Sequence, residues 1–279
     1  MTVSLCQTFQ ELAAQTWQRL RDAERTGLFW SEETNTETIL MELMRRHPHQ
    51  VGVRAFTKAA EARNGADWEW WIGSSEGWFG MRIQAKRLKL PSESFSKLQT
   101  QKAKGQPDTQ INTLISSAYA DRLTPAYCFY VFSNRWPSAA LWAAPRVNTS
   151  AISPLGCLIA HAGAVRSVGS NALSKLLPVA APWHLLVCQC SISAGSESLA
   201  AHMCGLLQQS AAASGARGVF ADQQDEEFPL FPPQQHLPSY MSGLLAATAD
   251  GVLAGPADDA LRVRAQQRGL AGFVLVRVN

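Results

Sequence analysis

The fold is decided by two neighbouring stretches of sequence, NGADWEWWI at residues 64–72 and MRIQAKR at residues 81–87. Both are typical of β-strands, and the turn GSSEG at residues 73–77 joins them into a predicted hairpin. Side chains two residues apart in a strand lie on the same side, so Gln84 and Lys86 are expected to share a face. If the two strands pair, Asp67 can lie beside them.

The segments around this hairpin alternate between helical and strand patterns. Helical spacing of apolar residues predicts helices, and short aromatic or β-branched runs predict strands. Up to residue 135 the order is helix 5–26, helix 36–46, strand 51–56, strand 68–72, strand 78–87, helix 109–120 and strand 127–132. This order predicts an α/β fold in which helices pack on a sheet.

Beyond residue 136 the patterns are weaker. They suggest helices at 156–165 and 196–214 and strands at 184–190 and 272–278. The C-terminal half is either a second lobe or a set of further layers on the same core, and the sequence leaves both open.

Composition supports a globular protein, because 46% of the 279 residues are hydrophobic. A net charge of +3 is too small to indicate nucleic-acid binding by itself, but the charges are unevenly distributed. Residues 82–104 hold seven basic residues against Glu93: Arg82, Lys86, Arg87, Lys89, Lys97, Lys102 and Lys104. Residues 222–259 are acidic and contain no lysine or arginine. The basic segment is either a surface for a polyanion or a solvated loop.

The first twenty residues lack the continuous apolar segment of a signal peptide, and the sequence shows no transmembrane span. The six cysteines have no spacing typical of a disulfide-rich domain. The expectation is a cytoplasmic protein with reduced cysteines.

The residues of the hairpin suit metal-assisted cleavage of a phosphodiester. Magnesium takes oxygen ligands, which Asp67, the Gln84 side chain and the Ala85 carbonyl group could supply. Lys86 would orient or deprotonate a water and stabilise the phosphate in the transition state. Because a glutamine supplies no negative charge, we expect a second carboxylate, and Glu33 is the first candidate. Less favoured candidates are Glu32, Glu37, Glu61 and Glu69.

In this order, Glu33, Gly65-x-Asp67 and Gln84-x-Lys86 resemble the PD-(D/E)XK nuclease superfamily, in particular its Mrr-like and archaeal Holliday-junction-resolvase-like branches. Residues 56–71 and 82–87 also look like an uncharacterised bacterial family. The resemblance covers roughly residues 5–135. It implies a restriction-endonuclease-like nuclease core over residues 1–135, with a mixed sheet flanked by helices, and a C-terminal α/β extension over residues 136–279.

The resemblance also implies Mg²⁺- or Mn²⁺-dependent DNA cleavage, with a role in restriction or antiviral defence. Asp67, Gln84 and Glu33 would hold the metal, and Lys86 would complete the catalytic set. Nucleic-acid contacts are expected from Arg82, Arg87, Lys89 and Gln110.

Two departures and two alternatives accompany this hypothesis. Ala66 stands where the superfamily has proline, and the spacing from Asp67 to Gln84 is long. Asp67 can instead be a turn residue with Gln84 and Lys86 on a solvated face. The protein can also be a catalytically inactive nuclease-fold module that binds nucleic acid or a partner protein. The protein can also form homo-oligomers, a possibility that the sequence leaves open.

Other motifs give weaker signals. The GSSEG turn matches a hydrolase nucleophile motif, but a strand follows it where that motif needs a helix. The histidines and cysteines at positions 184, 188, 190, 202 and 204 fit no zinc module and are expected to pack in the core. Trp71 shares the predicted face of Asp67 and is a candidate for base stacking.

Overall fold

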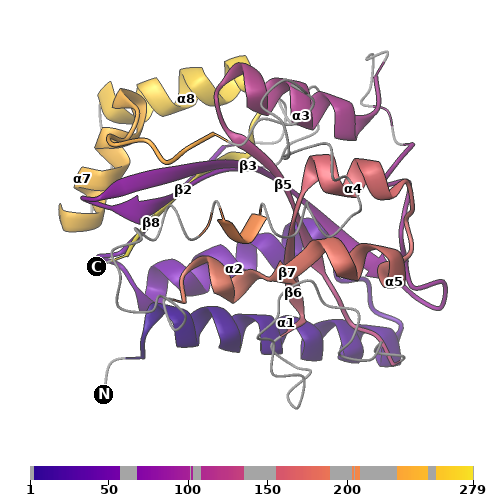
Figure 1. Ribbon diagram of the computed structural model, residues 1–279. Coiled ribbons are helices and arrows are strands. Elements are labelled where there is room, and N and C mark those ends of the chain that lie inside the picture. The colour runs from indigo at the N-terminus through magenta and orange to yellow at the C-terminus, as the bar shows by residue number, and fades with distance from the viewer. Residues whose placement is uncertain are drawn as a thin grey trace.

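The computed structural model describes residues 3–56, 68–100, 102, 108–134, 155–188, 203, 205–207, 231–250 and 256–278. In this part of the chain an eight-stranded mixed sheet lies between two layers of helices (Figure 1). The predicted α/β class, a mixed sheet flanked by helices, is confirmed.

Most helices are those that the apolar spacing predicts. Helix α1 begins after Ser4, whose hydroxyl accepts from the backbone of Gln7 in a capping box, and Gly27 ends it in the left-handed conformation. The second helix begins four residues before its predicted start, because Ser31 caps it by accepting from Thr34. The helices are α1 (Leu5–Thr26), α2 (Glu32–Arg46), α3 (Gln110–Ala120), α4 (Ala162–Val168), α5 (Leu173–Leu176), α7 (Ser242–Asp250) and α8 (Pro256–Arg268), with 3-10 turns η4 (Leu177–Val179), η5 (Trp183–Leu186) and η6 (Ser239–Met241).

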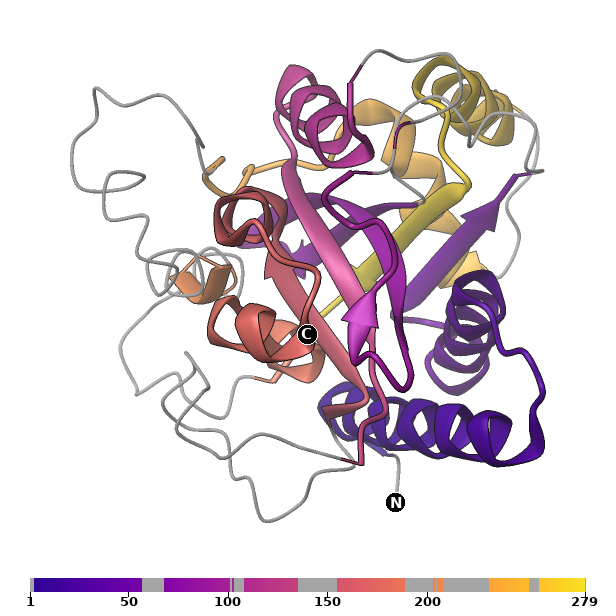
Figure 2. The ribbon, with the colours of Figure 1, turned by 90° about the vertical axis from the view of Figure 1, so that its right-hand side faces the viewer.

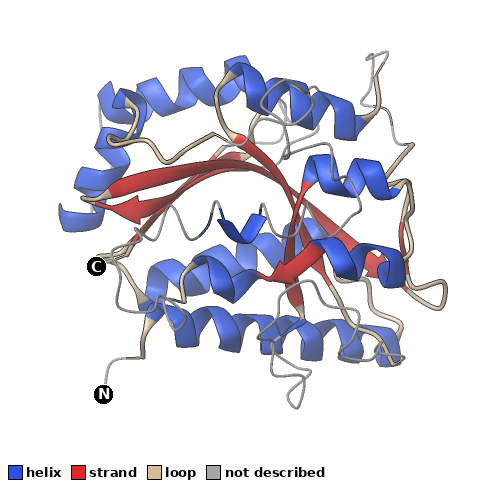
Figure 3. Cartoon of the chain, viewed as in Figure 1, coloured by secondary structure: helices blue, strands red, loops and turns tan. Residues whose placement is uncertain are grey.

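The strands run in the spatial order β1-β8-β2-β3-β5-β6-β7, and β4 pairs with β3 outside this path. Strands β2 and β3 form the predicted antiparallel hairpin, and α3 crosses over from β3 to the parallel strand β5. The strands are β1 (Val51–Ala55), β2 (Trp68–Ser74), β3 (Gly77–Lys89), β4 (Ser94–Phe95), β5 (Thr124–Tyr130), β6 (Cys157–His161), β7 (Ala180–Pro182) and β8 (Gly272–Arg277). Figure 3 separates the strands from the helices that cover them.

The C-terminal half belongs to the same sheet. Strands β6 and β7 extend it beyond β5, and β8 lies between β1 and β2, parallel to β2. Of the two arrangements that the sequence leaves open, further layers on the same core is the one observed. Residue 135 is therefore not a boundary between two separate sheets.

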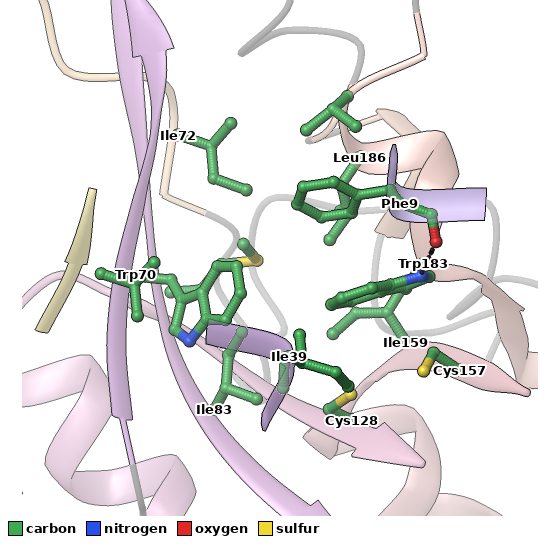
Figure 4. Packing of buried hydrophobic residues seen from close by; sticks show 14 of the residues in the cluster. Phe9, Ile39, Trp70, Ile72, Ile83, Cys128, Cys157, Ile159, Trp183 and Leu186 are labelled. Carbon is green, nitrogen blue, oxygen red and sulfur yellow. Dashed lines mark hydrogen bonds between the residues drawn. The ribbon is translucent and has the colours of Figure 1, made fainter. Parts of the chain in front are cut away.

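Two hydrophobic clusters fill the space on the two faces of the sheet. Helices α1 and α2 cover one face, and α3, α4, α7 and α8 cover the other (Figure 2). In the first cluster Trp70 and Ile72 of β2 face Phe9 and Trp183, whose rings lie 4.5 Å apart (Figure 4). The Trp183 indole Nε1 also donates to the Phe9 carbonyl oxygen at 2.9 Å, so its polar atom is satisfied inside this core.

Two predicted elements of the C-terminal half are wrong. Residues 156–165 hold strand β6 followed by the start of α4 instead of one helix. Residues 184–186 belong to the 3-10 turn η5, and residues 187 and 188 follow it without forming a strand. Short apolar runs suit either kind of element, and pairing of β6 with β5 decides the first case. Of the predicted helix at 196–214, residues 203 and 205–207 are described, and they are helical.

The expectation of reduced cysteines is also wrong for one pair. Cys6 in the first turn of α1 forms a disulfide with Cys188, 182 residues later, after η5. Cys128 and Cys157 are free thiols inside the core. His184 lies on η5, while Cys190, His202 and Cys204 lie outside the described residues.

Candidate nucleic-acid cleavage site

A cleft of about 550 Å³ opens where β3 extends past the first residue of β2. Trp68, the first residue of β2, pairs with Ile83, so the residues of β3 from Gln84 onwards lie beyond this pair. The first turn of α2 forms one wall of the cleft and the first residue of α3 belongs to another. The residues lining the cleft are Phe29, Glu32, Glu33, Thr36, Glu37, Ala55, Phe56, Trp68, Gln84, Ala85, Lys86, Arg87, Lys89, Ser96, Lys97, Gln110 and Ala271.

Six of the predicted site residues are therefore brought together. They are Glu33, Gln84, Lys86, Arg87, Lys89 and Gln110. They come from α2, β3 and α3, which are separate in sequence and meet only through the packing of two helical layers on one sheet. Of the other two predicted residues, Arg82 lies elsewhere, and Asp67 lies outside the described residues, as does Glu61.

Gln84 is the most buried polar residue of the cleft. Its side chain is 4% exposed, and its Oε1 finds no hydrogen-bond donor within the described part of the chain. A buried amide oxygen without a donor costs free energy that a bound cation or donor group would recover. The oxygen of Gln84 is thus suited to hold a ligand of the cleft.

Lys86 lies two residues further along β3 and is half-buried. Its Nζ donates to Oε1 of Gln110 at 3.2 Å. Gln110 is the first residue of α3, and Thr109 caps that helix by accepting from Asn112. The cap fixes the start of α3, and the start of α3 fixes one direction of the Lys86 ammonium group.

Acidic residues enter the cleft from the first turns of α2. Glu33 and Glu37 are exposed, and Glu32 accepts from the backbone N–H of Arg87 at 3.2 Å through its Oε1. Carboxylates in a first turn also stabilise the helix through its dipole, which alone explains why Glu32 and Glu33 stand there. No group of three histidines, cysteines or acids close enough to hold a metal occurs among the described residues.

Basic residues line the same cleft from β3 and the segment after it. Arg87 donates through Nη1 to the Trp30 carbonyl oxygen at 2.9 Å, which joins β3 to the segment between α1 and α2. Lys89 and Lys97 are exposed at the cleft. The lining thus carries four basic side chains, Lys86, Arg87, Lys89 and Lys97, beside the three glutamates.

Arg82 does not belong to this site, contrary to expectation. Its side chain is fully buried, with Nη2 3.1 Å from Glu69 Oε2 and 2.7 Å from Asp121 Oδ2. Glu69 is its direct cross-strand partner in β2, so the pair is enclosed in the middle of the sheet. Arg82 is therefore removed from the nucleic-acid contacts, and Glu69 from the candidate metal ligands.

Trp71 is also a core residue. It is 1% exposed, and its Nε1 donates to Glu69 Oε1 at 2.9 Å. Such an enclosed indole offers no face to a base. The aromatic residue that does lie open at the cleft is Phe29, which sequence reasoning missed.

No helix of the described chain combines the length and the apolar character needed to cross a membrane. Comparison with the curated proteins found no match, and comparison with the solved structures found none either. One family model matches residues 5–272, which is nearly the whole chain. The chain therefore belongs to the family of unknown function DUF6615.

Proposed function

We propose that this protein hydrolyses phosphodiester bonds of nucleic acid, most simply DNA, with the help of a divalent metal ion. The observation that carries the proposal is the pairing in one cleft of a buried amide oxygen without a donor, Gln84 Oε1, with the ammonium group of Lys86. The resemblance to PD-(D/E)XK nucleases, which rests on Glu33, Gly65-x-Asp67 and Gln84-x-Lys86, adds to this support.

The residues of the cleft fit a hard cation. Gln84 offers an oxygen and Glu33 a carboxylate, and Asp67 is the further carboxylate expected from the sequence. Magnesium or manganese held there would reduce the charge on the scissile phosphate and make a bound water more acidic. Glu33 is exposed and lines the cleft together with Gln84.

The protein's own groups would do the remaining work. Lys86, directed by Gln110, would donate to a phosphate oxygen or orient the attacking water. Arg87, Lys89 and Lys97 would hold the phosphates on either side of the scissile one, which makes the affinity fall with salt. Glu32, which already accepts from the Arg87 backbone, would keep the two walls of the cleft together.

The test is cleavage of plasmid, linear duplex and single-stranded DNA by the purified full chain with Mg²⁺ or Mn²⁺. Lys86→Ala and Gln84→Ala should each lower the rate at least a hundredfold, and Asp67→Ala should do the same. Lys175→Ala removes an exposed lysine of α5 that does not line the cleft, so it should cut as the wild type does. Equal rates of cleavage by wild type and Lys86→Ala would show that this cleft is not the catalytic site.

The second candidate is a nuclease-fold module that binds nucleic acid or a partner protein without cutting. The observation in its favour is that the buried polar residue of the cleft is an uncharged glutamine, Gln84, which adds no negative charge to a metal site. Calorimetry with Mn²⁺ distinguishes the nuclease from the binding module. A catalytic site should bind Mn²⁺ in the wild type and fail to bind it in Gln84→Ala. DNA binding that falls with salt, together with no heat from manganese, favours the module.

The cellular setting is part of the same proposal. A nuclease acting on DNA in restriction or antiviral defence would work in the cytoplasm, whereas disulfides such as Cys6–Cys188 persist mainly in oxidising compartments. Alkylation of free cysteines at the moment of cell lysis shows whether Cys6 and Cys188 are reduced or joined in a disulfide in the cell. Self-association stays a prediction, tested by the mass in solution.

A further inference from the structure

The segment between α1 and α2 carries two neighbouring apolar side chains in the open. Leu28 is 70% exposed and Phe29 is 74% exposed. Exposed apolar side chains are common, but Phe29 also lines the cleft that contains Gln84 and Lys86. Its position relative to the proposed chemistry, more than its exposure, makes Phe29 notable.

One face of the Phe29 ring is already occupied. The guanidinium carbon of Arg87 lies 4.9 Å from the ring centroid, in cation–π contact. The residue as a whole is nevertheless 74% exposed. Phe29 therefore has a cationic support and a large free surface for a flat, apolar partner.

The backbone around Phe29 is held in place on both sides. Before it, Gly27 ends α1 with a left-handed cap, and the Leu28 N–H donates to the Ala23 carbonyl oxygen at 3.0 Å. After it, the Trp30 carbonyl oxygen accepts from Arg87. The Trp30 indole also donates to Asn35 Oδ1 at 2.9 Å.

These contacts hold the backbone of Phe29, and Arg87 supports its ring, before any ligand arrives. A preorganised aromatic surface loses little conformational entropy on binding. Arg87, which supports Phe29, follows Lys86 in β3, and all three residues line the same cleft.

We propose that Phe29, supported by Arg87, is a stacking platform for an unpaired base, so that the substrate of the cleft is single-stranded or locally unpaired nucleic acid. This inference rests on the proposed function for the identity of the polymer. The basic side chains of the cleft, Lys89 and Lys97 among them, attract phosphates. An unpaired base offers a flat apolar surface that can stack on the Phe29 ring. A base inside a duplex is already stacked on both sides and has no face free for the ring.

The experiment measures binding without cleavage, in EDTA, with the full chain. The probes are a single-stranded oligonucleotide containing 2-aminopurine, its RNA equivalent, and a blunt duplex of the same length. Phe29→Leu should weaken single-strand binding about tenfold and abolish the quenching of 2-aminopurine. Phe29→Trp should restore both. Duplex binding should not change.

The control variant is Met41→Leu, since Met41 is an exposed apolar residue of α2 that does not line the cleft. It should bind every probe as the wild type does. The salt dependence of binding should be the same for Phe29→Leu and wild type, because no phosphate contact is removed.

Single-strand binding and quenching that survive Phe29→Leu would overturn the platform, as would a wild type that binds only the blunt duplex. Neither result affects the metal-dependent cleavage argued for Lys86 and Gln84. Conversely, loss of stacking in Phe29→Leu in a protein that never cuts DNA would keep the platform and reject the nuclease.

Discussion

Lys86 Nζ lies 3.2 Å from Oε1 of Gln110, so a lysine of β3 is held by the first residue of α3. Gln110 thereby acts as a positioning residue for the proposed catalytic group. Gln110→Ala should lower kcat about tenfold to a hundredfold with little change in KM, because the ammonium group loses a fixed direction. Single-turnover cleavage of an end-labelled oligonucleotide measures the effect.

Ser116→Ala is the matched control for this prediction, because Ser116 is an exposed residue further along the same helix. A second variant, Gln110→Glu, places a carboxylate next to Lys86 and favours its charged form. If Lys86 takes a proton from water, the pH–rate profile moves to higher pH in this variant. Rates that are insensitive to both Gln110 substitutions would show that α3 does not position Lys86.

Gln84→Glu should strengthen metal binding, because it adds a negative charge at the buried oxygen of the cleft. We expect the Kd for Mn²⁺ to fall about tenfold. In EDTA the variant should melt at a lower temperature than wild type, since its carboxylate is then buried without a partner. Saturating Mn²⁺ should return the stability, which is the linkage expected of a true ligand. A melting temperature that ignores Mn²⁺ would contradict the prediction.

The sequence predicts the helices and strands that form the cleft better than it predicts which of their side chains are buried. Periodicity and caps locate α1, α2 and α3, and the hairpin pattern locates β2 and β3, because these signals arise within a few neighbouring residues. Arg82, Gln84 and Lys86 alternate along one strand and look equivalent in the sequence. In the structure Arg82 is fully buried, whereas Lys86 is only half-buried.

The register of the hairpin holds a signal that separates them. Glu69 and Arg82 are direct cross-strand partners, and an acid opposite a base in the middle of two apolar strands indicates a buried pair. Phe29 gives no comparable signal, because a phenylalanine between two helices is equally suited to the core. Its exposure follows from where α1 and α2 pack on the sheet.

Arg82→Met should destabilise the protein by about 3–5 kcal/mol, because it leaves Glu69 and Asp121 buried without their main partner. Arg264 of α8 lies near both acids and Arg268 pairs with Asp121, so these two arginines will recover part of this loss. Arg262→Met is the control, since Arg262 is 51% exposed in its pair with Asp258 and should change stability by less than about 1 kcal/mol. Urea unfolding measures both, and equal effects of the two variants would contradict the buried network.

The Cys6–Cys188 disulfide should contribute about 2–4 kcal/mol to stability, because it closes a long loop in the unfolded chain. Cys6→Ala together with Cys188→Ala should lower the urea midpoint accordingly. In the folded wild type, no cysteine of the described chain should react quickly with iodoacetamide at pH 8. Burial raises the pKa of Cys128 to about 12 and raises that of Cys157 as well, so both thiols stay protonated. Rapid alkylation of Cys6 without reductant would exclude the disulfide.

Stability should fall in acid through His161. This side chain is fully buried at the end of β6, and its Nδ1 accepts from the Gly163 N–H at 3.1 Å as the cap of α4. Burial lowers the pKa of His161 to about 4 from the usual 6.5. Between pH 6.5 and pH 4 the unfolded chain takes up a proton that the folded protein does not, so the free energy of unfolding decreases as the pH falls. Above pH 6.5 the imidazole is neutral in both states and contributes no slope.

His161→Asn tests this relation, because asparagine can cap α4 through its side-chain oxygen and does not titrate. The difference in unfolding free energy between pH 7.5 and pH 4 should shrink by as much as about 3 kcal/mol relative to wild type. His184, whose pKa burial also lowers to about 4, is retained in the variant and will keep part of the acid sensitivity. Urea unfolding at a series of pH values gives the comparison, and an unchanged slope in His161→Asn would mean that His161 does not account for the acid sensitivity.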